Sequence, residues 1–193
     1  MNLTDLSKTC EEHCFLVRRF LELRGDDVLK AADRISRAME HDHKILLFGN
    51  GGSAADAQHI AAELVGRFVH ERPGLPAIAL TSDSSTITSV ANDYGFEFVF
   101  ARQIESLGRK GDVAFAISTS GSSPNVIEGL RAARDRGLIT IALLGRDGGP
   151  ARDLAQLPLV VSAEKTARIQ EVHGLIGHIL CEAVEHRLFR SSR

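Results

Sequence analysis

Hydrophobic and polar positions recur along this chain at two periods, one typical of helices and one typical of buried strands. Residues 3 to 23 and 26 to 40 place apolar residues at a helical period between charged ones, and Arg24-Gly25-Asp26 separates the two stretches. The pattern therefore predicts an N-terminal helical hairpin. Its apolar stripe has to be buried, within the chain or against another subunit. The stripe includes Leu16, Val17, Phe20 and Leu21.

Five short apolar runs follow, and helical patterns or loops separate them. The runs cover residues 44 to 49, 75 to 81, 113 to 117, 138 to 144 and 157 to 161. Strands that alternate with helices at short spacing predict a parallel sheet with helices on both faces. We expect an α/β fold, a doubly wound five-stranded parallel sheet with an N-terminal helical hairpin and a long C-terminal helix. The whole chain, residues 1–193, is predicted to be one domain, with the hairpin in 1–42 and the α/β core in 43–193.

The first strand leads into a glycine turn, Asn50-Gly51-Gly52-Ser53, and then into a helix that continues through Val65. A strand-to-helix junction of this kind leaves backbone N–H groups unpaired at the positive end of the helix dipole, which suits a phosphate or another anion. Ser53 followed by Asp56 is also an ordinary capping arrangement. The loop alone therefore does not decide between ligand binding and capping.

Two helices carry polar residues at a spacing that places them on one face. His59 and Glu63 lie four residues apart in the helix after the glycine turn, so they share a face as a possible metal or acid–base pair, although such pairs are also common on solvated helices. In the C-terminal helix, predicted over 167 to 188, Gln170 and His178 flank Gly174 on a ridge with open space. Taken by itself, His178 is more typical of a hydrogen-bonded core or interface histidine than of a site residue. The buried stripe of that helix is expected to comprise Ile169, Val172, Leu175, Ile176, Ile179, Ala183 and Val184.

A second polar loop follows the third strand and is rich in hydroxyl groups. It reads Ser118-Thr119-Ser120-Gly121-Ser122-Ser123-Pro124-Asn125, and the next helix is expected to have Ser123 at its N-cap and Pro124 at its first position. Capping needs only one of these hydroxyls, so the loop favours phosphate binding over a plain turn. Another hydroxyl-rich segment, residues 81 to 96, is predicted as a loop in which Asn92 and Asp93 form an Asx-turn. A short helix is expected from Glu97 to Leu107.

Composition narrows the class of protein. With 193 residues and 44% apolar content, the chain can bury one core. The formal charge of −2 is spread without a basic block, which argues against a nucleic-acid-binding protein. No apolar run approaches the roughly 20 residues that span a bilayer, and the first residues lack a signal-peptide pattern, so we expect no membrane partner and a cytoplasmic location. Cys10, Cys14 and Cys181 are interpreted as reduced, mostly packing residues.

Five blocks of the sequence, in order and in register, resemble a known family. They read NGGSAADAQHIAAELVGRF, ERPGLPAIAL, ANDYGF, ISTSGSSPNVI and RIQEVH. These blocks are similar to those of the phosphoheptose isomerases (sedoheptulose 7-phosphate isomerases), which have the SIS sugar-isomerase fold. The resemblance extends over nearly the whole chain. It implies an aldose–ketose isomerase that converts sedoheptulose 7-phosphate to D-glycero-D-manno-heptose 7-phosphate through an enediol(ate), the first step of ADP- or GDP-heptose biosynthesis for polymers such as lipopolysaccharide.

The resemblance also implies roles for individual residues. Glu63 and His178 would be the catalytic acid–base pair, and Asn92 and Asp93 would contact the sugar chain. The zinc site of some family members corresponds to His59, Glu63, Gln170 and His178. The substrate-binding residues would be Asn50, Gly51, Gly52, Ser53, Glu63, Asn92, Asp93, Ser118, Thr119, Ser120, Ser123 and Gln170. Family members are homotetramers with sites at subunit interfaces, and the same assembly is implied here.

Isomerisation of an aldose and a ketose moves a proton between C1 and C2, so it needs a base near a carbon acid and an acid near the carbonyl oxygen. Glu63 suits the first role and His178 the second. Zinc would polarise the carbonyl, but a metal-bound carboxylate is a poorer base, and the sequence leaves this tension open. Some relatives have Asp where this chain has Ala167, and we expect the loss to be tolerated because Glu63 and His178 are both present.

Two other functions fit the same fold. One is a non-catalytic binding protein of the DnaA initiator-associating type, whose TARIQE block this chain shares. The other is a regulatory module that senses a sugar phosphate through the serine loop without turnover. Neither needs Glu63 and His178 together, so the presence of both favours the enzyme.

Overall fold

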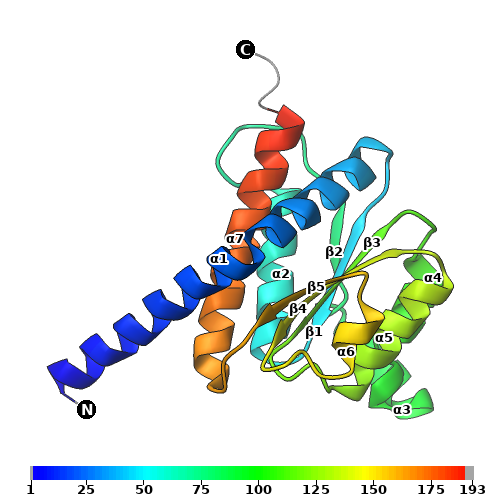
Figure 1. The fold of residues 1–193 in the computed structure, drawn as a ribbon. Helices are drawn as coiled ribbons and strands as arrows, with labels where there is room; N and C mark the ends of the chain where they lie inside the picture. The colour runs from blue at the N-terminus through cyan, green and yellow to red at the C-terminus, as the bar shows by residue number, and fades with distance from the viewer. Residues whose placement is uncertain (1, 190–193) are drawn as a thin grey trace.

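A parallel sheet of five strands lies at the centre of the molecule, in the order β2-β1-β3-β4-β5 (Figure 1). The computed structural model describes residues 2–189. The strands are β1 Ile45–Gly49, β2 Ala77–Ala79, β3 Val113–Ser118, β4 Ile139–Gly145 and β5 Leu157–Val161. The predicted doubly wound five-stranded parallel α/β sheet is confirmed. The second strand is shorter than the run of 75 to 81 that predicts it.

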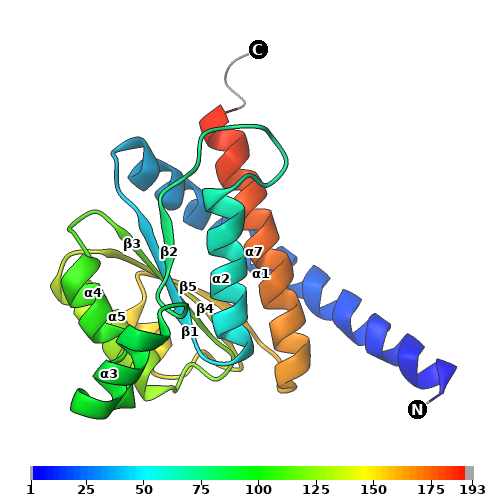
Figure 2. The ribbon, with the colours of Figure 1, turned by 180° about the vertical axis from the view of Figure 1, so that it is seen from behind.

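Helices cover both faces of the sheet and make a three-layer molecule. The helices are α1 Leu3–Glu40, α2 Gly52–Val65, α3 Ser84–Tyr94, α4 Ala101–Leu107, α5 Pro124–Asp135, α6 Ala151–Leu154 and α7 Thr166–Phe189, with a short 3₁₀ turn, η1, at Phe96–Phe98. Helices α1, α2 and α7 pack on one face, where Figure 2 shows α2 and α7 side by side. Helices α4, α5 and α6 pack on the other face. The expected long C-terminal helix is therefore present as α7.

Alternate residues of each strand point to opposite helix layers. In β1, Ile45 and Leu47 join the core under α1, α2 and α7, whereas Leu46 and Phe48 join the core under α4 and α5. Because both faces of a parallel sheet are covered, every residue of β1 and of β3 is buried. This double burial is why the strands read as continuous apolar runs in the sequence.

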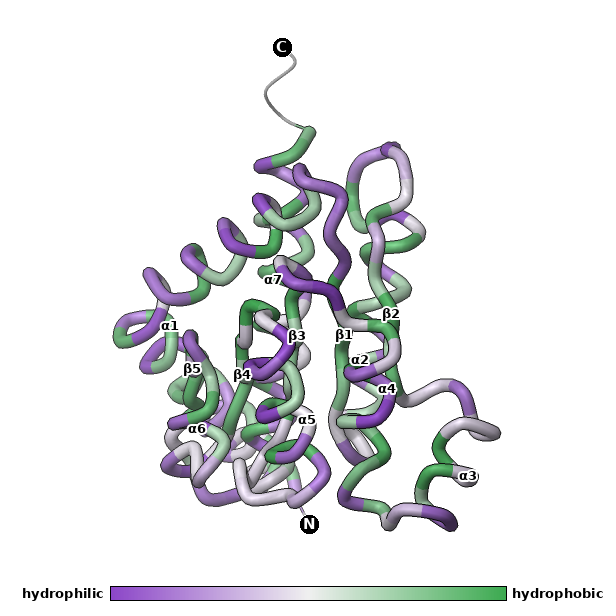
Figure 3. The backbone as a smooth tube through the Cα atoms, turned by 90° about the vertical axis from the view of Figure 1, so that its right-hand side faces the viewer, coloured by the Kyte–Doolittle hydropathy of each residue, from purple (hydrophilic) through white to green (hydrophobic). Residues whose placement is uncertain are grey.

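The predicted N-terminal hairpin is wrong, because α1 is one helix of 38 residues. A glycine within a helix costs only about 1 kcal/mol relative to alanine, and no proline interrupts the segment. Asp27 forms ion pairs with Arg24 at 3.4 Å and Lys30 at 2.9 Å, which support the helical turns around Gly25. In Figure 3, hydrophilic and hydrophobic segments alternate along α1. The N-terminal end of α1 projects beyond the rest of the molecule (Figure 1).

The hydroxyl-rich segment expected to be a loop is mostly the helix α3, so the predicted Asx-turn at Asn92 and Asp93 is also wrong. Asp83 caps this helix by accepting a hydrogen bond from the backbone N–H of Thr86 at 3.0 Å. Thr88 donates its hydroxyl to the carbonyl of Ser84 at 2.7 Å, one turn earlier. Local hydroxyl bonds of this kind are compatible with a helix once a cap starts it. The helix expected from 97 to 107 begins as the 3₁₀ turn and becomes α-helical at Ala101.

The apolar stripes are buried in part. On α1, Phe20 is buried and Leu16 and Val17 pack against the core, but Leu21 is 40% exposed. On α7, Leu175 is also exposed, whereas the rest of its predicted stripe is buried or partly buried. All three cysteines have free thiols, and only Cys181 is a packing residue, because Cys10 and Cys14 are exposed on α1.

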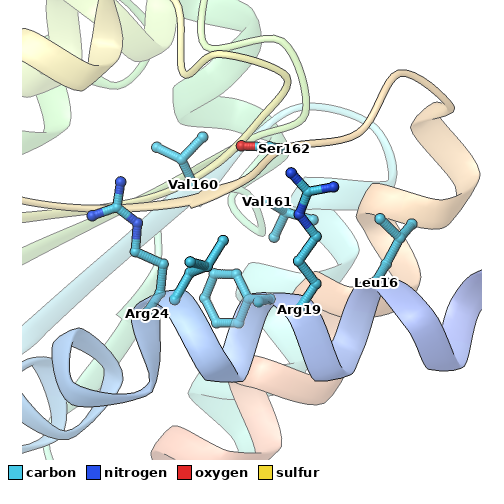
Figure 4. Close-up of a pocket in the computed structure, with 8 residues that line it drawn as sticks. Leu16, Arg19, Arg24, Val160, Val161 and Ser162 are labelled. Atoms are coloured by element: carbon cyan, nitrogen blue, oxygen red, sulfur yellow. The ribbon is translucent and has the colours of Figure 1, made fainter.

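A hollow of about 180 Å³ lies between α1 and the edge strand β5 (Figure 4). Arg19 and Arg24 border it, and apolar side chains of both elements line it. Within residues 2–189, no helix combines the length and the apolar character that crossing a bilayer would require.

Candidate active site

The strand order reverses between β1 and β3, and two polar loops leave the sheet at this point. In doubly wound sheets, ligands bind beyond the carboxyl ends of the strands where the order reverses. Gly49 of β1 is paired with Ile117 of β3, so the glycine loop and the serine loop start next to each other. Asn50 and Asn125 then exchange two side-chain hydrogen bonds, each 2.8 Å, from one loop to the other. The two predicted ligand loops therefore form one surface.

The glycine loop leads directly into the first turn of α2. Gly51 is the N-cap and makes no side-chain capping bond, and Ser53 lies inside the helix, where it is 5% exposed. The interpretation of Ser53 as the cap is therefore wrong, and the end of α2 has backbone N–H groups that suit an anion. A Cβ atom at Gly52 would collide with the side-chain amide of Gln170. The glycine at position 52 thus allows Gln170 of α7 to approach the loop closely.

The serine loop turns tightly before α5. The Ser118 hydroxyl accepts a hydrogen bond from the backbone N–H of Gly121 at 3.0 Å, and the Ser120 hydroxyl accepts one from the hydroxyl of Ser122 at 3.1 Å. Ser123 is the N-cap residue of α5, with Pro124 at the first helical position, as predicted. However, the Ser123 side chain makes no capping hydrogen bond, so its hydroxyl and the end of α5 are available to a ligand.

Helices α2 and α7 bring three predicted residues together. The Nε2 atoms of His59 and His178 lie 2.7 Å apart, so one imidazole donates a hydrogen bond to the other. The Oε1 atom of Glu63 lies 3.6 Å from Nε2 of His59, and its side chain is 25% exposed. One ligand atom from each of the three residues lies within 4.8 Å of the others. A carboxylate and two imidazoles thus meet between helices that are over 100 residues apart in sequence.

The donor set fits a divalent transition metal. Two imidazole nitrogens and one carboxylate oxygen are ligands that zinc accepts, and their convergence on one point is what a metal site requires. Gln170 lies two helical turns before His178 on α7 and contacts Gly52. The structure therefore places Gln170 beside the glycine loop, and among the histidine, cysteine, aspartate and glutamate residues of the described chain the convergent group consists of His59, Glu63 and His178.

Two residues of the site were not identified as site residues from the sequence. Asn125 is 2% exposed and connects the loops through Asn50, and its place directly after the serine loop was the available signal. The ring of Phe68 lies 5.5 Å from the ring of His178, between centroids, and no motif indicated this contact.

Asp56, one turn before His59, is half-buried. Burial raises the pKa of its carboxyl group, and His59 partly opposes the shift.

Asn92 and Asp93 lie elsewhere, in the exposed helix α3. Within the described chain, the one side-chain hydrogen bond that either residue makes joins Asn92 to Asp93 at 2.8 Å. A hollow of about 150 Å³ lies between the glycine loop and α3, but neither Asn92 nor Asp93 lines it. Ala167 is exposed in the first turn of α7, three residues before Gln170.

Known proteins are similar to this chain over almost its full length. The SIS domain family model matches residues 10–145. The phosphoheptose isomerase of Aquifex aeolicus (strain VF5) is 50% identical over 190 residues, which cover 98% of this chain and 100% of the relative. A solved phosphoheptose isomerase from Neisseria gonorrhoeae is 42% identical, with a TM-score of 0.89 over 94% of this chain and 97% of its own. Another, from Francisella tularensis, is 36% identical, with a TM-score of 0.92 over 96% of this chain and 100% of its own.

Proposed function

The chain belongs to the SIS-domain family and, within it, to the phosphoheptose isomerases, and from this premise we propose how its own residues carry out the reaction. It is an aldose–ketose isomerase that converts sedoheptulose 7-phosphate to D-glycero-D-manno-heptose 7-phosphate. The observation that supports a catalytic role is the convergence of Glu63 with His59 and His178. A binding protein or sensor of the same fold needs no such group, so the alternative functions are not supported.

In the proposed reaction, Glu63 takes a proton from C1 of the ketose and returns it to C2 of the enediol. His178 moves the oxygen proton in the same direction: it protonates the carbonyl oxygen at C2 as the enediol forms and takes the proton from the hydroxyl at C1 as the aldose carbonyl forms. The electrons of the C1–H bond form the C1–C2 double bond and then the new C2–H bond. The hydrogen bond between His59 and His178 supports this exchange, because it orients the ring of His178. The net change is a shift of two hydrogens with no redox cofactor.

The phosphate group would bind at the two helix N-termini of the switch point. Support comes from the uncapped first turn of α2 and from the free hydroxyl of Ser123 at the start of α5. Asn50, Gly51, Gly52, Ser118, Thr119 and Ser120 complete this proposed site, and Gln170 and Ser53 lie beside it. The sugar chain would then extend toward Glu63 along α2. Contacts from Asn92 and Asp93 remain a proposal that the single chain does not support.

We also propose that His59, Glu63 and His178 hold a zinc ion, with Gln170 as the fourth protein ligand. When bound, the ion would polarise the substrate carbonyl and stabilise the negative charge of the enediolate. With the ion bound, the imidazoles of His59 and His178 would bind it in place of their mutual hydrogen bond, and a metal-bound Glu63 would be a weaker base, so the metal and the proton transfer place opposing demands on these residues. The prediction that Ala167 is tolerated is consistent with its exposed position, away from the three convergent side chains.

Residues 1–193 are proposed to form one SIS domain that assembles as a homotetramer with sites at subunit interfaces. Large apolar residues exposed along α1 support an assembly, since a monomer would leave them in water. We propose a cytoplasmic location, which the three free thiols support because thiols stay reduced there. The product would enter heptose biosynthesis for polymers such as lipopolysaccharide.

The test follows formation of the aldose from sedoheptulose 7-phosphate by wild-type protein and by Glu63→Gln, with and without a metal chelator. We expect turnover by the wild type, and a loss of kcat of about 10²- to 10⁴-fold in Glu63→Gln, because the amide cannot take the proton. Substrate should still bind this variant. A chelator that lowers the activity, with recovery on added zinc, would support the metal. If micromolar wild-type protein converts no substrate in the presence of zinc, the proposed mechanism is wrong.

A further inference from the structure

A buried ion pair joins the segment after α2 to the end of α7. Nε of Arg72 donates a hydrogen bond to Oε1 of Glu185 at 2.9 Å, and both side chains are only 1% exposed. Removing two charges from water is costly, so a buried pair is by itself weak evidence for stabilisation. Such a pair persists where further hydrogen bonds satisfy both charges, and its fixed geometry then determines how the connected segments are placed.

The carboxylate of Glu185 binds three successive backbone N–H groups. Those of Phe68, Val69 and His70 donate to it at 3.2, 2.9 and 2.9 Å. Burial alone would raise the pKa of Glu185, but these N–H groups and Arg72 outweigh burial and lower the pKa, so Glu185 is ionised at neutral pH. The turn that follows α2 is therefore fixed to α7 by one carboxylate.

The guanidinium of Arg72 binds the carbonyl end of α2. Nη2 donates to the backbone oxygen of Glu63 at 2.9 Å, and Nη1 donates to that of Leu64 at 2.8 Å. Helix α2 has no basic residue in its own last turn. Arg72 thus supplies the positive charge that favours the negative end of the helix dipole, and it satisfies carbonyls that the helix leaves unpaired.

Each half of the pair acts on one of the groups proposed to move protons. Arg72 holds the main chain of Glu63 itself, and Glu185 holds the backbone of Phe68, whose ring lies 5.5 Å from that of His178. We propose that Arg72 and Glu185 are positioning residues, which set the separation of Glu63 and His178 for isomerisation. This inference rests on the proposed function. A misplacement of reacting groups by about 1 Å can reduce a rate by about 100-fold, so a pair of this kind controls kcat without touching the substrate.

The experiment compares Arg72→Lys and Glu185→Gln with a matched control next to the start of β3. Lysine loses the planar fork of donors, and glutamine keeps the shape of glutamate but loses its charge. The control is Asp112→Asn, because Asp112 is also a buried carboxylate, 2% exposed, that pairs with Lys44 and accepts the backbone N–H of Arg109 at 2.8 Å. It should destabilise the fold by a similar amount while leaving the site unchanged.

We expect kcat of Arg72→Lys and Glu185→Gln to fall by about 10- to 100-fold at temperatures where circular dichroism shows all variants folded. KM should change little, because the proposed phosphate loop follows β3 and does not contact the pair. Asp112→Asn should keep the wild-type kcat. The proposal is overturned if kcat of both variants falls no more than in Asp112→Asn at the same interval below each melting temperature.

NMR signals of the ¹⁵N-labelled rings of His59 and His178 test the positions of these side chains in the absence of substrate turnover. The signals of His178 and His59 should shift in Glu185→Gln and stay unchanged in Asp112→Asn, and unchanged signals in both variants would contradict positioning. Absence of turnover in the wild type would instead disprove the proposed function, and the ring signals would still decide this inference. Should either variant not fold, Phe68→Leu removes only the ring contact, and it should lower kcat and shift the His178 signals. If Phe68→Leu changes neither kcat nor the His178 signals, the result contradicts the proposed role of Glu185.

Discussion

His173 is a buried titratable residue that the proposed chemistry does not use. It is 0% exposed on α7, and within residues 2–189 neither ring nitrogen has a hydrogen-bond partner of good geometry. Burial lowers its pKa to about 4, and the backbone of Leu144 opposes this shift only in part. The imidazole is therefore neutral in the folded protein at pH 7. Its effect on stability follows from the difference between this pKa and the value of 6.5 that it has in the unfolded chain.

Stability should fall as the pH falls from 6.5 to 4, because over this window the unfolded chain binds a proton at His173 and the folded protein does not. The lowered pKa of His173 contributes roughly 3 kcal/mol to the free energy of unfolding. This contribution is complete above pH 6.5 and lost below pH 4. Urea unfolding at several pH values measures it. His173→Leu should show a weaker pH dependence in this window, whereas the exposed His186→Gln should keep that of the wild type. An equal pH dependence in all three would contradict a buried neutral imidazole.

The elements that the sequence predicted well are those with continuous apolar runs. The strands β1, β3, β4 and β5 were found because burial leaves them almost no polar residues, and the partly exposed edge strand β2 was found because its run is also apolar. Helix α3 was missed because serine and threonine favour turns as often as helices, and only the cap at Asp83 decides between them. The hairpin was wrongly predicted because Gly25 was interpreted as a break. A glycine ends a helix only where its φ and ψ angles leave the helical region, and the amino-acid sequence alone does not show these angles.

Gly25→Ala should raise the free energy of unfolding by about 0.5 to 1 kcal/mol if α1 is continuous. A Cβ atom at this position would meet nothing within 4 Å, so the gain in helix propensity has no steric penalty. Gly137→Ala is the matched control, because Gly137 has φ +73° and its Cβ would lie 3.2 Å from Lys110. The control should lower stability in the same urea titration. A loss of stability in Gly25→Ala would indicate a turn at this position and would restore the predicted hairpin.

At the scale of the whole molecule, the site is assembled from loops and helices far apart in the sequence. The glycine and serine loops each follow a strand of the parallel sheet, and β1 and β3, which are neighbours where the strand order reverses, bring the two loops together. The spacing of His59 and Glu63 predicted a shared face, but not that His178 would lie 2.7 Å away. That distance depends on how closely α2 and α7 pack, which Ile60 and Gly177 determine. A Cβ atom at Gly177 would lie 2.8 Å from the Ile60 side chain, a detail visible only in three dimensions.

The proposed assembly of several chains rests on large apolar residues that are exposed along α1. Phe15 is 59% exposed and Leu23, which lines the hollow beside β5, is 67% exposed. Burying such a side chain in an interface contributes about 1.5 to 3 kcal/mol, so Phe15→Glu should weaken subunit association by at least about tenfold per contact. Light scattering after gel filtration should show a tetramer for the wild type and smaller species for Phe15→Glu.

Activity should fall together with the proposed tetramer, because the sites proposed at subunit interfaces would need the neighbouring chain. Leu107→Glu provides the control, since Leu107 is 40% exposed on α4, on the opposite face of the sheet from α1. Leu107→Glu should leave both the molecular mass of the assembly and the activity unchanged. If Phe15→Glu becomes monomeric and keeps full kcat, each chain carries a complete site, and the proposed interface location has to be abandoned. A wild-type monomer at micromolar concentration would instead mean that α1 has another partner.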